Sequence, residues 1–387
     1  MAHSYIISAV RTPIGKFGRS FSRLKATELG GIAIRAAIER ASLEPGMVEE
    51  VIYGNVIQAG NGQNPAGQAC SNAGLKDTVI KYTVNTVCAS GMLAVENADR
   101  EISLGERDLI VAGGMESMSN APLLLPPELR WGPKQLLFKN FKLDDSMLRD
   151  GLMDAFYFEH MGASAELSAR KYAITREMAD EFAARSQALA IKATESGAFE
   201  REIVKTDQLS RDEGLRSTTM QELAKLQPAF DRNGILTAGN SSQLSDGASA
   251  LVLASERAVN KLGIKPIARI EGYTQASLNS RDYVEAPVPA TRQLLEKLGR
   301  NIDDYDLVEH NEAFSVASLV VQKELKIDDS RFNVHGGAIA LGHPLGNSGS
   351  RIMVTLINAL QLRKGKTGIA TLCHGGGGGH SISIEML

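Results

Sequence analysis

Two kinds of apolar pattern alternate along the chain. Helical spacing, with apolar residues three or four positions apart, covers residues 27–41, and a short strand-like run follows at 51–55. The same order returns later, where a helical pattern at 289–298 precedes a strand-like run at 306–311. Helices that alternate with short buried strands are typical of βα units, which build largely parallel sheets covered by helices. The pattern therefore predicts an α/β fold.

The two halves of the chain also resemble each other, which indicates an internal duplication. A helical pattern opens at Ser90-Gly91 in the first half and at Ser348-Gly349 in the second. Each is followed by a buried strand pattern, at 109–112 and at 369–372, that leads into glycines. Any α/β chain shows some self-similarity of this kind, so coincidence is the alternative to duplication.

A region between the halves differs from both. Within it, a long amphipathic helical pattern spans 164–198 with a turn near Thr175, and 207–215 is polar and loop-like. We predict an inserted helical loop domain, either a cap with a solvated charged face or a lid that contacts an anionic substrate. Its basic residues include Arg130, Lys134, Lys139, Lys142 and Arg149. The predicted domains are residues 1–118 with 248–268, 119–247 and 269–387.

Composition narrows the classes of function. The 387 residues carry 42 Lys and Arg against 45 Asp and Glu, a net charge of −3, which argues against a general nucleic-acid binder. An apolar run of about 18 residues, as a membrane span requires, is absent. The first residues do not show a signal-peptide pattern, so we expect a cytoplasmic protein. Three cysteines fit a reducing compartment without a disulfide framework.

The first of three candidate reactive loops contains Cys88. Residues 84–92 place this cysteine where a strand pattern gives way to a helical one. Because free N–H groups at a helix start favour an anion, we expect the Cys88 thiol to ionise more easily than a free one. Small neighbours leave room for a substrate. The alternative is a buried apolar cysteine, which we expect of Cys70 within a predicted helix.

The second loop offers a histidine for proton transfer. His343 is flanked by Gly342 and Pro344, which shape the backbone and clear space around the imidazole. Imidazole is the side chain best matched to proton transfer near neutral pH. His335 is a second candidate in the same loop, and a surface histidine without function is the alternative.

The third loop is the run from Cys373 to His380, which contains five glycines in succession. Such a run permits close contact between backbone and ligand, and its N–H groups suit an oxyanion site. A zinc site made of Cys373, His374 and His380, with His343, is a competing reading, but the usual ligand spacings are absent. Neither a P-loop nor a dinucleotide-binding glycine motif is present.

Six motifs, in family order and along essentially the whole chain, are similar to those of the thiolase family. They are residues 11–15, 84–91, 113–119, 311–314, 336–346 and 373–375. Residues 145–157, followed by His160-Met161-Gly162, are most similar to the acetoacetyl-CoA (biosynthetic) thiolases. The resemblance implies duplicated α/β halves stacked in five layers (αβαβα) with an inserted helical loop domain.

The resemblance also implies roles for residues in these loops. Cys88 matches the family nucleophile that takes the acyl group as a thioester, and His343 matches the base that activates its thiol. Cys373 matches the second cysteine, which removes a proton from the α-carbon of acetyl-CoA. Asn311 matches a residue that holds a water at one oxyanion hole, and the N–H groups of Cys88 and Gly375 match the other hole.

By the same resemblance, the substrate is an acyl-CoA. The positions that match substrate and CoA contacts are His160, Met161, Phe230, Ala238, Ser242 and Phe314. The implied reaction is the reversible condensation of two acetyl-CoA to acetoacetyl-CoA and CoA, with ping-pong turnover through a cysteine thioester. It needs no metal or redox cofactor, since CoA is substrate and product. A homodimer or homotetramer is implied, because thiolases associate through the sheets of their nucleophile halves.

Three other functions stay open. The nearest is a degradative thiolase of fatty-acid β-oxidation that acts on longer 3-ketoacyl-CoA. A non-catalytic acyl-CoA or sterol binding protein would not need all four reactive residues, and a cysteine hydrolase would leave Cys373 idle. Departures from the family pattern are Gly67, Glu222, Tyr283, His310, His335, Asn347 and His374. The bulky Tyr283 is expected to restrict the acyl pocket to short chains or to reshape it.

Overall fold

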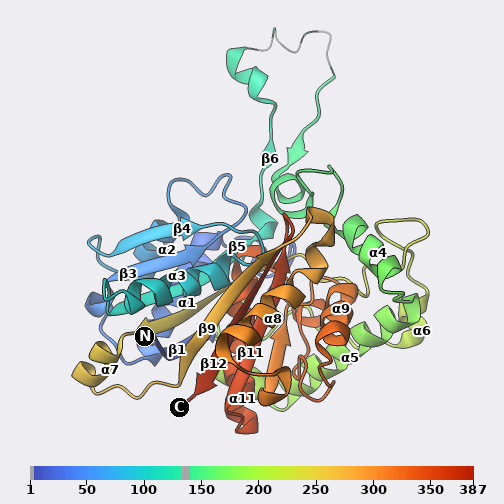
Figure 1. Ribbon diagram of the computed structural model, residues 1–387. Helices are drawn as coiled ribbons and strands as arrows, with labels where there is room; N and C mark the ends of the chain where they lie inside the picture. Colours follow the sequence, from blue (N-terminus) through green and yellow to red (C-terminus); the bar gives the residue numbers. More distant parts are fainter. Residues whose placement is uncertain (1–3, 133, 135–136, 138–139) are drawn as a thin grey trace.

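The computed structural model describes residues 4–132, 134, 137 and 140–387. A ten-stranded sheet runs through both halves of the molecule (Figure 1). Its strands are β1 (Tyr5–Arg11), β2 (Gly15–Lys16), β3 (Glu50–Gly54), β4 (Ile80–Val84), β5 (Leu109–Ser117), β8 (Ser245–Ala254), β9 (Ala268–Ser277), β10 (Leu307–His310), β11 (Thr367–His374) and β12 (Gly378–Met386). The α-helices are α1 (Ala26–Arg40), α2 (Pro65–Ala73), α3 (Ser90–Ser103), α4 (Met161–Lys171), α5 (Arg176–Glu195), α6 (Met220–Ala224), α7 (Glu256–Leu262), α8 (Pro287–Leu298), α9 (Ser315–Leu325), α10 (Ala338–Leu341) and α11 (Leu345–Arg363).

The sheet is mixed, so the prediction of a largely parallel sheet is wrong. Its strand order is β10–β11–β12–β9–β1–β8–β5–β3–β4, and β2 pairs with β8. Strand β3 runs parallel to β4 and β5, and β10 runs parallel to β11, while the other neighbours are antiparallel. Strands β11 and β12 are joined by a glycine turn that is too short for the crossover which parallel strands need. Strand β8 returns from the inserted region against β1 and β5.

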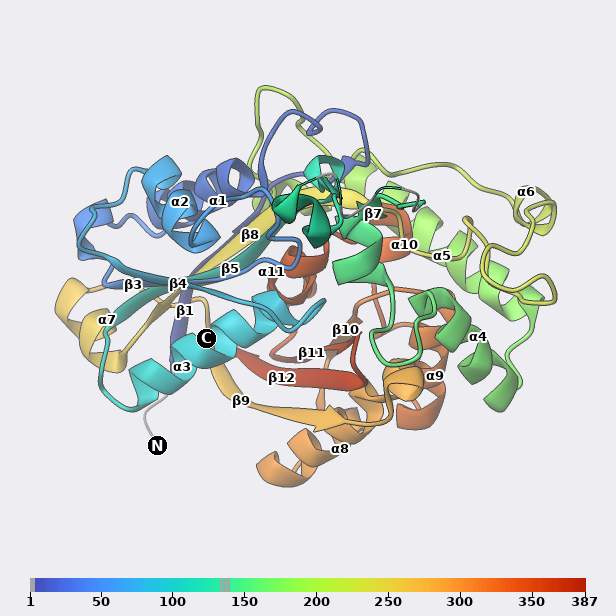
Figure 2. The same cartoon turned by 90° about the horizontal axis from the view of Figure 1, so that it is seen from above.

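Helices cover both groups of strands and confirm the predicted αβαβα layers. Helices α1 and α2 pack together on the N-terminal strands, and α8 packs on β9 and β12 at the other side of the molecule. Between the two groups lie α3 and α11, which pack against each other (Figure 2). Met92 of α3 and Ile352 of α11 belong to one buried cluster with Ile52 of β3 and Leu372 of β11. The central layer therefore holds the two halves together.

Glycines allow the starts of α3 and α11 to meet. A Cβ atom on Gly349, near the start of α11, would fall 2.5 Å from the backbone N of Met92 in α3. A Cβ atom on Gly114 would fall 2.0 Å from the carbonyl O of Gly346, at the start of α11. Only glycine permits so close an approach. The loops that precede these two helices, which contain Cys88 and His343, are brought together by this contact.

Two predicted boundaries in this region are wrong. Strand β5 does not end at Gly113-Gly114 but keeps its pairing with β8 as far as Ser117. It can continue because glycine leaves room for the Gly346 carbonyl above the strand. Helix α11 begins at Leu345 rather than at Ser348, because Pro344 at the N-cap has a backbone angle suited to a helix start.

The inserted region contains both predicted helices and an arm. Helices α4 and α5 are separated at Thr175, as predicted, and its hydroxyl caps α5 by accepting a hydrogen bond from the N–H of Met178. The paired strands β6 (Leu123–Leu124) and β7 (Asp144–Asp145) form the base of an arm that projects from the body of the molecule (Figure 1). Lys139, one of the predicted basic residues, lies outside the described residues.

In the part of the chain that the structure describes, none of the helices has the length and apolar character that crossing a bilayer requires.

Candidate active site

The residues predicted from separate loops come together at one pocket. Cys88 precedes α3, His343 lies between α10 and α11, and Cys373 and Gly375 lie where β11 ends. The pocket that these residues line is narrow, with a cavity volume of about 50 Å³. Asn311 adjoins it, since Asn311 Nδ2 lies 3.5 Å from His343 Nδ1. Sulfur, imidazole, amide and backbone N–H groups from both halves of the chain thus converge at this pocket.

A strained turn presents Cys88. The preceding Val87 has φ of 51°, in the left-handed region that β-branched residues rarely adopt. Ser90 holds the turn: its hydroxyl donates to the carbonyl of Val87 at 2.6 Å and accepts from the N–H of Thr86 at 2.9 Å. The thiol is therefore presented by a backbone shape that the following helix start stabilises.

The expectation of an easily ionised Cys88 is wrong for the resting protein. Burial raises the pKa of its thiol to about 12. The N–H groups of Gly375 and of Cys88 itself lower that pKa, and the buried carboxylate of Glu116 raises it, but burial is the largest effect. Exclusion of water disfavours the thiolate more than the helix start favours it. Cys88 is consequently a neutral thiol until a base removes its proton.

His343 is suited to be that base. Burial, with a contribution from Arg351, lowers the pKa of His343 to about 3, so its imidazole is neutral at physiological pH. The hydroxyl of Ser348 donates to the Pro344 carbonyl at 2.9 Å and lies 2.5 Å from His343 Nδ1. Since the hydroxyl proton is committed to the carbonyl, Nδ1–H of His343 donates to Ser348, and Nε2 keeps a free lone pair. The ring can accept a proton at Nε2.

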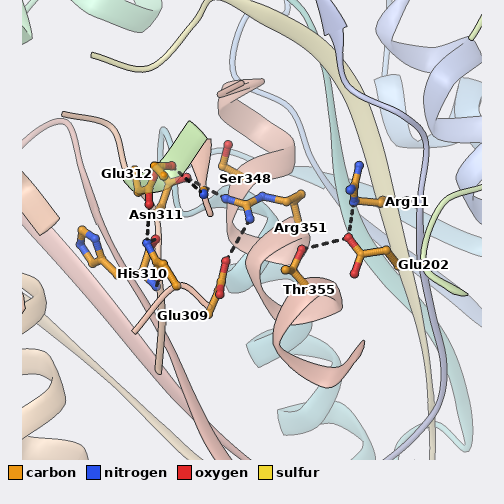
Figure 3. A network of polar contacts seen from close by, with 12 residues as sticks. Arg11, Glu202, Glu309, His310, Asn311, Glu312, Ser348, Arg351 and Thr355 are labelled. Atoms are coloured by element: carbon orange, nitrogen blue, oxygen red, sulfur yellow. Dashed lines mark hydrogen bonds and ion pairs between the residues drawn. The ribbon is translucent and has the colours of Figure 1, made fainter. Parts of the chain in front are cut away.

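Behind Asn311 lies a buried network that sequence reasoning missed (Figure 3). Arg351 of α11 donates to Glu309 at 3.3 Å and to Asn311 Oδ1 at 3.4 Å. Because its oxygen faces Arg351, the Asn311 amide directs its NH₂ group toward His343. On the same face of α11, Thr355 donates to Glu202, which is paired with Arg11 at 2.6 Å. The signal in the sequence was Arg351, a charged residue inside a predicted helix that carries no other charge before Arg363.

A second missed residue is Glu116 of β5, which is fully buried. Its carboxylate accepts N–H hydrogen bonds from Gly346 at 2.9 Å, Val56 at 3.1 Å and Ile57 at 3.2 Å. Burial raises its pKa to about 7, although these N–H groups oppose the shift. Glu116 therefore ties the start of α11 to the loop after β3, directly behind the pocket.

The second cysteine is more deeply buried than the first. Cys373 is 1% exposed, and burial raises the pKa of its thiol, which the neighbouring sulfur of Cys88 raises further. Both sulfurs also raise the pKa of Tyr283, so all three groups lie close together. Two neutral thiols beside one neutral imidazole form a set that can exchange protons without a permanent charge.

A larger pocket opens next to the first and contains most of the predicted CoA contacts. Its cavity volume is about 510 Å³. His160, Phe230, Ala238, Ser242 and Phe314 all line it, and His160, Ser242, Phe314 and His343 line both pockets. The ring of Phe230 stacks on His160 at 4.7 Å and meets Phe314 edge-on at 5.6 Å. The two pockets therefore adjoin each other.

The cations at this larger pocket are not the basic residues named above, although Arg216 belongs to the predicted insertion. Lys16 and Arg216 line it, whereas Arg130, Lys134, Lys142 and Arg149 do not. Arg149 instead pairs with Asp144 of β7. Spacing along the chain gave no indication of Lys16, because β2 approaches the pocket only through its pairing with β8.

Residues that depart from the family pattern lie in different parts of the structure, some at the pocket and some away from it. Tyr283 lines the inner pocket, with its hydroxyl donating to the carbonyl of Met161 at 3.0 Å. His310 lies against Ser318 and Phe332, and His335 against Phe199, away from the pocket. Among the described residues, no three His, Cys, Asp or Glu side chains are grouped for a metal ion, so the competing zinc arrangement is not formed.

Comparison with protein-family descriptions gives two adjoining matches. Residues 4–257 match "Thiolase, N-terminal domain", and residues 264–386 match "Thiolase, C-terminal domain".

Curated relatives and solved structures match along the whole chain. The acetyl-CoA acetyltransferases of Escherichia coli and of Synechocystis are 48% and 45% identical to it, each with 100% of both chains covered. The crystal structure of the Acat5 thiolase from Ascaris suum in complex with coenzyme A superposes with a TM-score of 0.94 at 41% identity, and covers 100% of both chains. The Bacillus anthracis acetyl-CoA acetyltransferase superposes with a TM-score of 0.96 at 41% identity, covering 100% of this chain and 99% of that one.

Proposed function

Because the chain belongs to the thiolase family of acyl-transferring enzymes, we propose that it condenses two acetyl-CoA to acetoacetyl-CoA and CoA, reversibly. The observation that carries this proposal is the convergence of Cys88, His343 and Cys373 on one pocket. That pocket opens onto a larger one, large enough to admit part of a CoA and bordered by cationic side chains. CoA is then substrate and product, and no redox or metal cofactor takes part.

The first half-reaction transfers an acetyl group to Cys88. His343 Nε2 takes the thiol proton, and the sulfur attacks the thioester carbonyl of acetyl-CoA. The N–H groups of Gly375 and Cys88, which lower the pKa of this thiol, stabilise the oxyanion that forms. The C–S bond to CoA breaks, and the leaving thiolate takes the proton of Cys373. An acetyl-thioester on Cys88 remains, with an imidazolium and a Cys373 thiolate beside it.

The second half-reaction forms the carbon–carbon bond. The Cys373 thiolate removes a proton from the α-carbon of a second acetyl-CoA, and its carbonyl oxygen gains the charge of an enolate. The imidazolium Nε2–H of His343 stabilises that charge, and the NH₂ group of Asn311, which lies 3.5 Å from Nδ1 of the same ring, is the second donor. The enolate carbon attacks the acetyl group, the C–S bond to Cys88 breaks, and the Cys88 thiolate recovers its proton from His343. Cys88, His343, Cys373 and Asn311 are then back in the protonation states in which they started.

Short acyl chains are favoured by the shape of the inner pocket. The ring of Tyr283 is 2% exposed and its hydroxyl is held by the Met161 carbonyl, so it cannot swing aside easily. A degradative thiolase for longer 3-ketoacyl-CoA would need that space. The profile of kcat/KM against chain length separates the two, and we expect it to fall beyond acetoacetyl-CoA.

Intact-protein mass after addition of acetyl-CoA tests the proposal. Wild type is expected to gain one acetyl group, mapped to Cys88, and to release one CoA. Cys88→Ser should gain none, and Cys373→Ala should be acetylated but should not make acetoacetyl-CoA. Cys70→Ala is the matched control, because Cys70 is also buried but lies in α2, outside the pocket. Normal turnover by both active-site variants would overturn the assignment.

We further propose a homo-oligomer. The arm carries exposed apolar residues, which are unusual for a surface in water. They are Leu123, Leu125, Trp131, Leu137, Phe141 and Leu143. Strand β4 is at the edge of the sheet, with Ile80 46% exposed, and offers backbone groups to a second copy.

A further inference from the structure

The turn that follows Cys373 must be held still for Gly375 to act. Residues 375–377 are consecutive glycines, and Gly376 and Gly377 have φ of 88° and 90°. A glycine run has more backbone freedom than any other, and ordering it costs conformational entropy. Gly375 nevertheless lines the same pocket as Cys88, and its N–H is one of the groups that lower the pKa of the Cys88 thiol. A contact from a neighbouring group must therefore hold the Gly375 N–H in this orientation.

His374 is the side chain that contacts this turn. Its Nδ1–H donates to the carbonyl of Gly375 at 2.7 Å. The imidazole therefore holds the peptide group between Gly375 and Gly376, which directly follows the N–H of Gly375. The ring lies over Gly378: a Cβ atom there would fall 1.9 Å from His374 Nε2. Residue 378 therefore has to be glycine for the imidazole to occupy this place. His374 and Gly378 are cross-strand partners at the end of the β11–β12 pair.

A second layer of polar groups supports His374. The His380 ring lies 5.3 Å from the His374 ring, measured between centroids. His380 Nδ1–H donates to Glu96 Oε1 at 2.8 Å, and Glu96 is fully buried. Arg100 pairs with the other Glu96 oxygen at 3.3 Å, and the Gln275 amide also donates to it. The charges around the two rings come from Glu96 and Arg100 of α3, the helix that follows Cys88.

We propose that His374 is a positioning residue, which aims the Gly375 N–H at the sulfur of Cys88 and is supported by His380 and Glu96. The inference rests on the proposed function, because it assigns Gly375 a place in the oxyanion hole. A hydrophobic side chain at 374 would fill the same volume without holding the carbonyl. The glycine turn would then sample orientations in which its N–H misses the sulfur.

The test compares His374→Leu with His374→Asn, whose Nδ2–H takes the place of imidazole Nδ1–H. For His374→Leu we expect kcat to fall about 10- to 100-fold with KM for acetyl-CoA nearly unchanged, since the CoA contacts lie elsewhere. Alkylation of Cys88 by iodoacetamide at fixed pH, mapped by mass spectrometry, should slow about 3- to 10-fold, since the N–H favours the thiolate. His374→Asn should keep most of the wild-type kcat and most of the wild-type rate of Cys88 alkylation. His335→Leu is the control, a half-buried histidine away from the pocket.

The outcomes separate this inference from the proposed function. If wild type makes no acetoacetyl-CoA, the function fails and the alkylation rates alone test His374. If wild type is active and His374→Leu matches it in kcat and in Cys88 alkylation, the inference is overturned. Should His374→Leu fail to fold, Glu96→Gln provides the second variant. It is expected to lower kcat and Cys88 alkylation in the same direction, and wild-type values for both would equally overturn the inference.

Discussion

At the scale of single residues, burial governs the chemistry of the pocket. A cysteine at a helix start is expected to have a lowered pKa, yet Cys88 has one of about 12. The pKa of His343 is lowered to about 3 by the same burial. Each group is held in its neutral form because the charged form would lose its hydration. The Cys88 thiolate and the His343 imidazolium therefore form together, when a proton moves from the sulfur to the imidazole with a substrate present.

The raised pKa of Cys88 predicts how its reactivity depends on pH. Only the thiolate is alkylated by iodoacetamide, and a group with a raised pKa has less thiolate at every pH below that value. The logarithm of the Cys88 alkylation rate should therefore rise steadily from pH 7 to pH 10. An unperturbed thiol would level off near its pKa of about 8.5.

Free glutathione provides the comparison for this measurement, and Cys88→Ser shows the rate that belongs to other sites. A plateau for Cys88 below about pH 8.5 would contradict the neutral resting thiol.

At the scale of elements, the contact between β5 and the start of α11 determines the geometry of the site. Gly114 receives the Gly346 carbonyl, and Glu116 on the same strand accepts the Gly346 N–H. The loop with His343 and the helix with Ser348 and Arg351 both depend on that position. Sequence patterns placed the helix and the strand correctly but missed the end of β5 and the start of α11, because these two ends depend on this tertiary contact.

Gly114→Ala tests the contact. The new Cβ would lie 2.0 Å from a backbone oxygen, so α11 must shift. Overpacking of this kind costs about 1–3 kcal/mol, and we expect the urea midpoint to fall with an unchanged m-value. Activity should fall as well, since His343 moves with α11.

Gly46→Ala is the matched control, because its Cβ would meet only the flexible end of Lys76, at 3.1 Å. Gly114→Ala with wild-type stability and activity would show that the contact does not position the site.

At the scale of the whole molecule, the arm between β6 and β7 stands apart from the core (Figure 1). Trp131 is 77% exposed and Leu125 is 63% exposed, and both would be stabilised by burial against another copy. We expect the double variant Leu125→Ser/Trp131→Ser to form smaller assemblies than wild type, as measured by light scattering after size-exclusion chromatography.

Leu362→Ser, on the exposed face of α11, should leave the assembly unchanged and is the control. The specific activity of the arm variant should stay near that of wild type, because the described arm residues do not line either pocket. An unchanged mass for the arm variant would exclude the arm as an interface.

Much of the fold was predictable because periodicity reports which faces are buried. Helix α1, helix α8 and the break at Thr175 follow from the spacing of apolar residues. Strand direction did not follow from it. An apolar run looks the same whether its neighbour is parallel or antiparallel, and β8 and β12 find their partners only when the distant segments assemble.

The sequence by itself determined the reactive groups and their loops: a thiol before a helix, an imidazole between Gly342 and Pro344, and a second thiol before glycines. Only the tertiary structure decided their protonation states, the orientation of Asn311 by Arg351, and the anchoring of the glycine turn by His374. The reason is physical. Residue types and local backbone preferences are encoded along the chain, whereas exclusion of water and contact between distant side chains exist only once both halves have packed together.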